Sequence, residues 1–330
     1  MRYFHLFSSA FPRFVLAYFH LPRAPKIGRT TVIKSAEKGR GRMSSEIILQ
    51  AVVSGLLMGL IYALVAVGLS LIFGLMEIVN FAHGEFLMLA MYASFWLWAL
   101  GGLDPLVSLP LVVVLLAAAG LLTHYGIIRH ILDAPMLAQV CATFGLAVTL
   151  RAGAQFLWTP DFRIVADPLI AGRVQIGPIF IGQPQLVAGL ICIAAFIALW
   201  LFVTRTETGL ALQATSQDRQ AAAVMGIPTD RMSALGWAIG LACVAVAGSM
   251  LSTFFYIFPD VGANFALLAF VAVALGGFGS ILGSLVAGVL IGLIESLGGL
   301  LISPSYKTVI VFALYLAVVL VRPRGLFGRF

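Results

Sequence analysis

Long uncharged stretches dominate this chain, and short polar segments separate them. The first, residues 47–76, has no formal charge, and further uncharged runs cover 86–103, 174–204, 232–259 and 261–294. A helix needs roughly 20 apolar residues to cross the hydrocarbon core of a bilayer. The pattern therefore predicts candidate spans at 47–67, 68–82, 84–101, 106–126, 136–157, 184–203, 232–254, 262–278, 281–301 and 306–321.

Two places decide how many of these segments cross a membrane. The segment 68–82 is short for a span, and residues 262–301 can form two spans or one span plus a re-entrant piece. We therefore expect an all-α, polytopic integral membrane protein with 8–10 transmembrane helices, including broken or re-entrant segments. Composition supports this class, because 61% of residues are hydrophobic and 10% are charged, against about 25% charged in soluble domains.

Basic residues in the short loops predict the orientation, since cytoplasmic loops of membrane proteins carry more Lys and Arg. With ten spans, one side receives Arg129, Arg205, Arg219, Arg231, Arg322, Arg324 and Arg329, and the other Arg151, Arg163, Arg173 and Lys307. The first side, with both termini, is predicted to be cytoplasmic. Alternating apolar residues in 158–183 favour a short external hairpin. Arg151 lies near an external span end, as does Glu295, and we expect Arg151 to snorkel.

The N-terminal residues differ in composition from the rest. Residues 1–43 hold nine basic residues and one acid, Glu37. Such a segment can bind an anionic membrane surface, or it can be upstream sequence with Met43 as the natural start. We expect the second, with 1–42 as a basic, disordered extension and 43–330 as the transmembrane domain.

Motifs of catalysis are missing from the sequence. It has no G-x-x-x-x-G-K-[ST] phosphate loop and no H-E-x-x-H, G-x-S-x-G or paired-cysteine pattern. We therefore expect no catalytic residue, metal site or cofactor, and a protein that is not an enzyme. Cys141, Cys192 and Cys243 stand alone in apolar stretches and are predicted to be small core residues.

The segment 77–85, EIVNFAHGE, places polar residues between two apolar runs. It can be a cytoplasmic turn or a helix break at depth beside a translocation path. A third reading is a proton relay of Glu77, His83 and Glu85 in a self-sufficient secondary transporter or channel, because intramembrane ionisable groups mark functional sites. The candidate path residues here are Glu77, Asn80, His83, Gly84 and Glu85.

A glycine-rich stretch follows at 275–296. Gly276, Gly277 and Gly279 interrupt the helical pattern, and Gly279/Gly283 and Gly288/Gly292 are G-x-x-x-G pairs that allow close helix packing. Two glycine-interrupted apolar segments also indicate a transport path in membrane carriers. We therefore predict a second helix break at 276–279 that faces the first.

The segment 204–231 is the long polar loop on the predicted cytoplasmic side. Asp218 is a suitable N-cap, residues 219–225 are Ala-rich, and Gly226 with Pro228 ends the helix. A short helix outside the membrane suits docking onto a soluble partner. The alternative is a connector that needs no partner.

Four motifs, in this order, carry a family resemblance: residues 80–85, the loop from Thr208 to Ile227, residues 275–280 with Gly283, and residues 322–328. On these motifs the chain from about Met43 onward resembles the permease subunits of bacterial ATP-binding-cassette importers for branched-chain amino acids. The resemblance implies transport of Leu, Ile, Val or similar small zwitterions across the bacterial inner membrane. One residue departs from the family pattern, because Gln213 stands where the family usually has Arg. That change removes one potential ionic contact to a partner.

The resemblance also implies partners. The loop would couple the permease to two cytoplasmic P-loop ATPases, which alone would bind ATP. A second homologous permease would complete the pore, and an external, periplasmic binding protein would deliver substrate; the lipid bilayer surrounds the assembly and no nucleic acid is involved. The residues expected at the ATPase are Arg205, Gly209, Gln213, Asp218, Arg219, Ala222 and Gly226.

Overall fold

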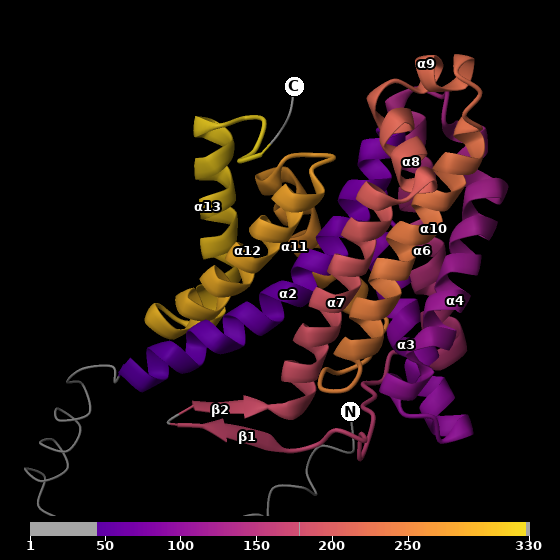
Figure 1. Cartoon of the computed structure of the whole chain (residues 1–330). Coiled ribbons are helices and arrows are strands. Elements are labelled where there is room, and N and C mark those ends of the chain that lie inside the picture. Colours follow the sequence, from indigo (N-terminus) through magenta and orange to yellow (C-terminus); the bar gives the residue numbers. More distant parts are fainter. Residues whose placement is uncertain (1–44, 178, 328–330) are drawn as a thin grey trace, which may run out of the picture. The chain divides into compact units, whose positions relative to one another are not determined.

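The computed structural model describes residues 45–177 and 179–327. The expected extension 1–42 and Met43 lie outside them. The N-terminal helices are α2 (Ser45–Met76), α3 (His83–Gly101), α4 (Pro105–Thr123), the π-helical turn η1 (His124–Ile128), α5 (Arg129–Ile131) and α6 (Met136–Trp158). The rest comprises β1 (Arg173–Ile176), β2 (Ile179–Gly182), α7 (Gln183–Arg205), α8 (Glu207–Gln217), α9 (Arg219–Val224), α10 (Thr229–Leu251), α11 (Val261–Gly276), α12 (Ile281–Leu301), the 3-10 turn η2 (Pro304–Tyr306) and α13 (Lys307–Val321) (Figure 1).

The described residues form an all-α membrane fold, as predicted. Eight of the described helical segments are long and apolar enough to cross a membrane. The additional apolar helix α11 has 16 residues, so it is about 24 Å long and too short for a hydrocarbon core of about 30 Å. It is not the re-entrant piece that the sequence allowed within 262–301, because it joins the end of α10 to the start of α12, which lie at opposite ends of the bundle (Figure 1).

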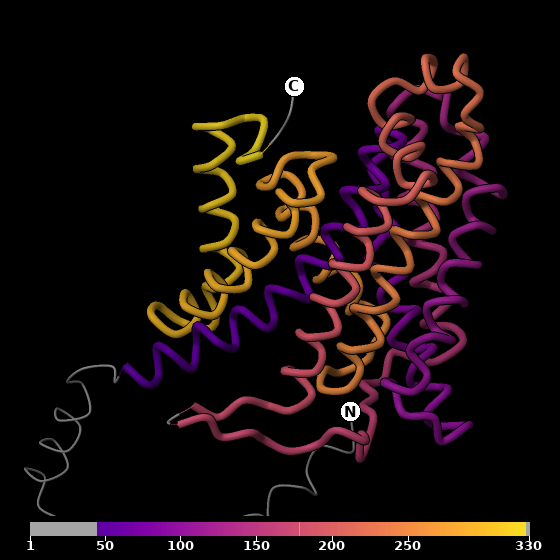
Figure 2. Tube along the Cα trace, viewed as in Figure 1, coloured from indigo at the N-terminus to yellow at the C-terminus, as the bar shows by residue number. Residues whose placement is uncertain are grey.

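The expectation of separate spans at 47–67 and 68–82 was wrong, because α2 is one helix of 32 residues. The glycines of α2 do not interrupt the helix. They instead allow neighbouring helices to approach it closely. A Cβ atom on Gly59 would lie 2.9 Å from the Val289 carbonyl oxygen of α12, and one on Gly68 would meet α10 at Gly240. Close packing was also predicted for Gly288 and Gly292, and both lie on α12 against α2. Figure 2 shows α2 running beside the C-terminal helices.

The two ends of α2 identify the two ends of the helix bundle. Gln50 exchanges hydrogen bonds with the backbone of Phe180 in β2, at 2.5 and 2.8 Å. We call this the hairpin end, defined by β1, β2 and residues 45–50; the antiparallel β1–β2 pair confirms the predicted hairpin. The opposite end holds α8, α9 and Phe327, and we call it the loop end (Figure 1).

Ser45 and Phe327 therefore lie at opposite ends of the bundle. This differs from the predicted ten-span path, in which the first span begins and the last span ends on one side; the two termini themselves lie outside the described residues. The expectation rested on an even number of spans. Merging two predicted segments into α2 reverses the side on which the described chain begins.

Residues 77–82 are the break between α2 and α3. Glu77 has a positive φ of 55°, and the chain then runs back along α2 until α3 begins at His83. The His83 Nε2 lies 3.0 Å from the Val65 carbonyl oxygen, about three turns or 16 Å below the end of α2. Both proposed readings of the segment therefore hold in part, because it turns at the loop end and α3 starts at depth.

Candidate translocation site and coupling segment

Three charged side chains meet where α3 and α11 begin. The Arg151 guanidinium of α6 donates to Glu85 Oε1 from Nε, at 3.1 Å, and from Nη2. Its Nε also lies 3.8 Å from Asp260 Oδ1. The Glu85 side chain is 2% exposed, whereas Arg151 is 35% and Asp260 57% exposed. We call these residues the Glu85–Arg151–Asp260 cluster.

The cluster corrects the expectation for Arg151. Arg151 lies on α6 about 10 Å from the end of that helix at Trp158. It does not extend along the helix toward the interface but pairs with a buried carboxylate on another helix. This pairing could not be predicted from sequence patterns, because Glu85 and Arg151 are separated by 66 positions.

Two glycines bring the starts of α3 and α11 together. A Cβ atom on Gly84 would collide with the Gly262 carbonyl oxygen, and one on Gly262 would collide with that of Gly84. Gly84 was predicted at a helix break, but Gly262 was not singled out. Gly84 faces Gly262, whereas it had been predicted to face the glycines at 276–279; at the other end of the same segment, Glu77 lines one cavity with Gly279.

Asn80 and His83 hold the break in place, and both side chains are fully buried. Asn80 Oδ1 accepts from the Ala82 backbone N–H, and His83 bonds to the Val65 carbonyl. Thr143 of α6 donates to the Val79 carbonyl at 3.1 Å. These contacts satisfy a backbone that leaves its helix inside the membrane, where unpaired polar groups are costly.

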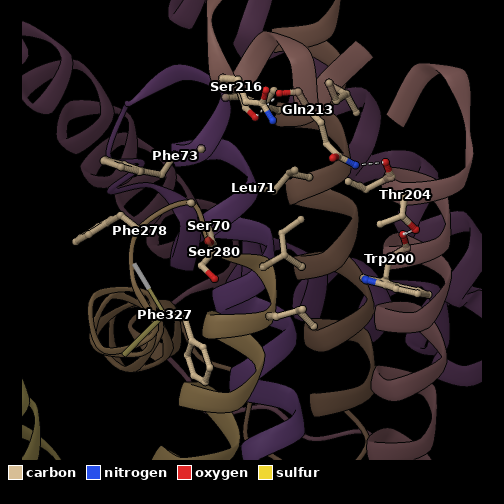
Figure 3. A pocket seen from close by; sticks show the side chains of 18 of the residues that line it. Ser70, Leu71, Phe73, Trp200, Thr204, Gln213, Ser216, Phe278, Ser280 and Phe327 are labelled. Atoms are coloured by element: carbon tan, nitrogen blue, oxygen red, sulfur yellow. Dashed lines mark hydrogen bonds between the residues drawn. The ribbon is translucent and has the colours of Figure 1, made fainter. Parts of the chain in front are cut away.

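Glu77 lies apart from the other polar residues of its motif. It is exposed and lines a cavity of about 690 Å³ at the loop end, together with residues of α2, α7 and α8 and the turn 278–282. Figure 3 shows Gln213 and Ser216 from α8 and Phe278 from the turn around this cavity. Glu77 and the cluster are thus at different depths.

The glycine turn at 276–280 shapes the floor of that cavity. Gly279 has φ +78° and lies against Gly74 at the end of α2. Gly276 packs on the Gly283 carbonyl group. Gly277, with φ +99°, ends α11. The predicted break at these glycines is confirmed, and its position is the loop end.

The C-terminal segment 322–327 completes this turn. The Leu326 N–H donates to the Leu275 carbonyl at 2.8 Å, and the Phe327 N–H donates to the Gly276 carbonyl at 3.1 Å. These bonds satisfy carbonyl groups that the end of a helix leaves open. The C-terminal motif and the glycine motif are therefore one structural unit.

The segment 204–231 forms two short helices at the loop end. Asp218 caps α9 by accepting from the N–H groups of Gln220 and Ala221, each at 2.9 Å, which confirms its predicted role. The helix α8 was not predicted. Its signal was Thr206, whose Oγ1 accepts from the Gly209 N–H at 3.0 Å as an N-cap.

The residues predicted to face an ATPase divide into two groups. Arg205, Asp218 and Gly226 are exposed and Arg219 is half-buried. Gly209 and Ala222 are buried, and Gln213 donates to the Val203 carbonyl at 2.6 Å. The Gln213 side chain therefore points toward α7. It is uncharged, and it is also turned away from the surface that a partner would contact.

Two exposed apolar residues at the end of α9 were not among the predicted contact residues. Val224 is 88% exposed and Met225 is 81% exposed. They lie outside the membrane-spanning helices, next to Gly226 with its φ of +84°. Together the two side chains form a small exposed apolar surface at the end of α9.

Comparison with known proteins assigns this architecture. The family model for the permease component of the branched-chain amino acid transport system matches residues 51–319. The chain belongs to this family. It is 33% identical over 296 residues to the high-affinity branched-chain amino acid transport system permease protein LivH of Escherichia coli K12, covering 85% of this chain and 96% of that protein.

Two further relatives are similar in sequence, one over most of the chain and one over a shorter part of it. The high-affinity permease protein BraD of Pseudomonas aeruginosa PAO1 is 30% identical over 299 residues, 85% of this chain and 96% of its own. The autoinducer 2 import system permease protein LsrD of Escherichia coli SMS-3-5 is 33% identical over 123 residues, 35% of this chain and 36% of its own. No solved structure matches the chain. The family resemblance is confirmed, and the protein is a multi-pass membrane permease component of a transport system.

Proposed function

We propose that this protein is the permease subunit of an ATP-binding-cassette importer that moves leucine, isoleucine, valine or similar small zwitterions across the bacterial inner membrane. The names of the relatives over most of the chain support the substrate class. One feature of the structure carries the coupling role, namely a capped two-helix segment that ends in exposed Val224 and Met225 outside the spans.

The segment 204–231 would dock on an ATPase subunit. The apolar end of α9 would fit a groove on such a partner, while Arg205 at the end of α7 and Arg219 at the start of α9 supply positive charges in the same segment. Behind the segment, α8 lines the loop-end cavity together with the glycine turn and the end of α2. Movement of α8 would thus be transmitted to both helix breaks. Two ATPases and a second homologous permease would complete the assembly.

Basic residues support a cytoplasmic loop end. The end of α7, α9, the start of α10 and the segment after α13 lie there and carry Arg205, Arg219, Arg231, Arg322 and Arg324, whereas Arg173 belongs to β1, Arg163 to the segment before it and Lys307 to the start of α13. Cytoplasmic loops carry the excess of Lys and Arg. The end of α13 would face the cytoplasm, and a periplasmic binding protein would meet the hairpin end.

The geometry disfavours the alternative of a self-sufficient carrier with a proton relay. The relay would need Glu77 next to His83 and Glu85. Instead, Glu77 lies in the turn at the loop end, and His83 bonds to a backbone carbonyl at depth. In our proposal the permease itself has no enzymatic activity and needs no cofactor.

Reconstitution tests the proposal. The chain, its second permease, the two ATPases and the binding protein in proteoliposomes should take up leucine only with ATP. Leucine uptake by this chain alone in a proton gradient would overturn it.

A docking variant tests the coupling role. Met225→Asp should reduce co-purification of the ATPases at least tenfold, and the conservative Met225→Leu should retain it. Equal co-purification of both variants would refute docking through the end of α9.

A further inference from the structure

We infer that the Glu85–Arg151–Asp260 cluster is an intramembrane binding site for the transported amino acid, with Arg151 binding the carboxylate and Asp260 with Glu85 binding the ammonium group. The inference rests on the proposed function and adds a site to it. Four observations carry it.

First, the cluster opens onto an exposed face of the helix bundle. Arg151 and Asp260 are partly exposed there, although Arg151 lies within the span α6. Charged groups inside a membrane almost always face a protein interior or a water-filled cavity, because contact with lipid is costly. This face of α6 therefore borders the second permease subunit or an aqueous path rather than hydrocarbon.

Second, two helices begin at this point without a side-chain cap. Neither α3 nor α11 has a capping hydrogen bond from the side chain of its N-cap residue. Each helix start carries roughly half a positive charge. Together with Arg151 they nearly balance the two carboxylates, so the site suits a ligand of zero net charge. In membrane carriers, interrupted helices direct such starts at the substrate carboxylate.

Third, one buried oxygen of the cluster has no hydrogen-bond partner among the described residues. It is Oε2 of Glu85, whose side chain is 2% exposed. The intramembrane carboxylate of Glu295 differs, since Tyr62 Oη donates to one oxygen at 2.7 Å and Lys307 Nζ lies 2.7 Å from the other. A purely structural ion pair would resemble the Glu295 site. The buried, unpartnered acceptor of Glu85 suits a ligand ammonium group.

Fourth, α6 places apolar side chains beside Arg151. Phe144, Val148, Arg151 and Gln155 follow one another at three- and four-residue steps, so they share one helix face, and both Phe144 and Val148 are exposed. A branched aliphatic side chain could pack on these two residues while its charged groups remain at the cluster. This arrangement favours leucine-like zwitterions over small polar ones.

Photo-crosslinking of the complete transporter tests the site. The probe is the diazirine analogue of leucine, applied to the reconstituted complex with its ATPases and binding protein. We expect adducts on residues 144–155 or 256–264 that excess leucine prevents. Adducts confined to the loop-end cavity, in residues 70–77 and 200–217, or the lack of any leucine-sensitive adduct, would overturn the assignment.

A matched pair of variants separates binding from structure. Asp260→Asn leaves the Glu85–Arg151 pair intact and should lower leucine uptake per ATP hydrolysed at least tenfold. Glu295→Gln makes the same chemical change at the fully partnered site and should leave that ratio unchanged. An unchanged ratio in Asp260→Asn refutes the inference. Absence of ATP-driven leucine uptake by the unmodified complex would instead refute the proposed function.

Discussion

Gly84 and Gly262 share one contact point in the membrane, and neither position has room for a side chain. The contact joins the first turns of α3 and α11 and limits the distance between Glu85 and Asp260, which lie one and two residues from the two glycines in sequence. The opposing atoms belong to the backbone, so rotation of a side chain cannot relieve a clash.

Gly84→Ala should therefore destabilise the protein by about 3 kcal/mol, at the upper end of the usual cost of overpacking. Thermal unfolding of the purified protein in detergent measures the effect. Gly145→Ala on α6 is the control, because a Cβ atom there would meet nothing within 4 Å. An equal effect of both substitutions would contradict the close contact.

Removing either partner of the Glu85–Arg151 pair should lower the free energy of unfolding by different amounts. Arg151→Gln leaves a buried carboxylate unpaired and should cost toward the lower end of roughly 3–5 kcal/mol. Glu85→Gln should cost less, because the Arg151 side chain is 35% exposed to begin with. The double variant should be more stable than Arg151→Gln. Additive losses in thermal unfolding would show that the pair contributes no coupling.

Substitutions of Asp218 can separate the effect of its helix cap from the effect of its negative charge. Asp218→Ala removes both hydrogen bonds to the start of α9 and should cost the helix about 1 kcal/mol. In the complete transporter, ATP hydrolysis should then continue with less leucine moved per ATP. Asp218→Asn keeps a good cap and should restore the ratio. If Asn behaves like Ala, the negative charge rather than the cap is needed.

Gly325 allows the C-terminal segment to pack against the end of α11, which we call the seal. A Cβ atom there would lie 2.6 Å from the Gly277 nitrogen and 2.8 Å from the Ala274 oxygen, and its φ is +80°. Gly325→Ala should detach residues 325–327 and speed tryptic cleavage after Arg324. Gly177→Ala is the control for backbone strain alone, because Gly177 has φ +61° with nothing within 4 Å. Unchanged cleavage in Gly325→Ala would refute the seal.

Sequence patterns predicted the helices and strands that depend on interactions between residues close together in the chain. Apolar runs placed most spans within a few residues, since a helix in lipid must satisfy its backbone internally whatever its neighbours are. Asp218 and the Ala-rich run after it predicted α9, because capping acts within one turn. The alternating residues around 174–181 likewise predicted β1 and β2.

Contacts between distant segments were beyond the reach of those patterns. Cys141 was expected in the core and is exposed, whereas Cys192 and Cys243 are buried as expected, because only packing decides which face of an apolar helix is covered. For the same reason α2 could not be told from two shorter spans.

By itself, the sequence determined the all-α membrane fold, the interruption of the apolar pattern at 77–85 and the short helix after Asp218. The tertiary structure decided that Gly84 meets Gly262 and that Arg151 pairs with Glu85. Hydrophobicity and capping act along the chain and can be read from it. The depth of a helix start and the partner of a buried charge depend on which helices pack together, and that is fixed only when the whole bundle has formed.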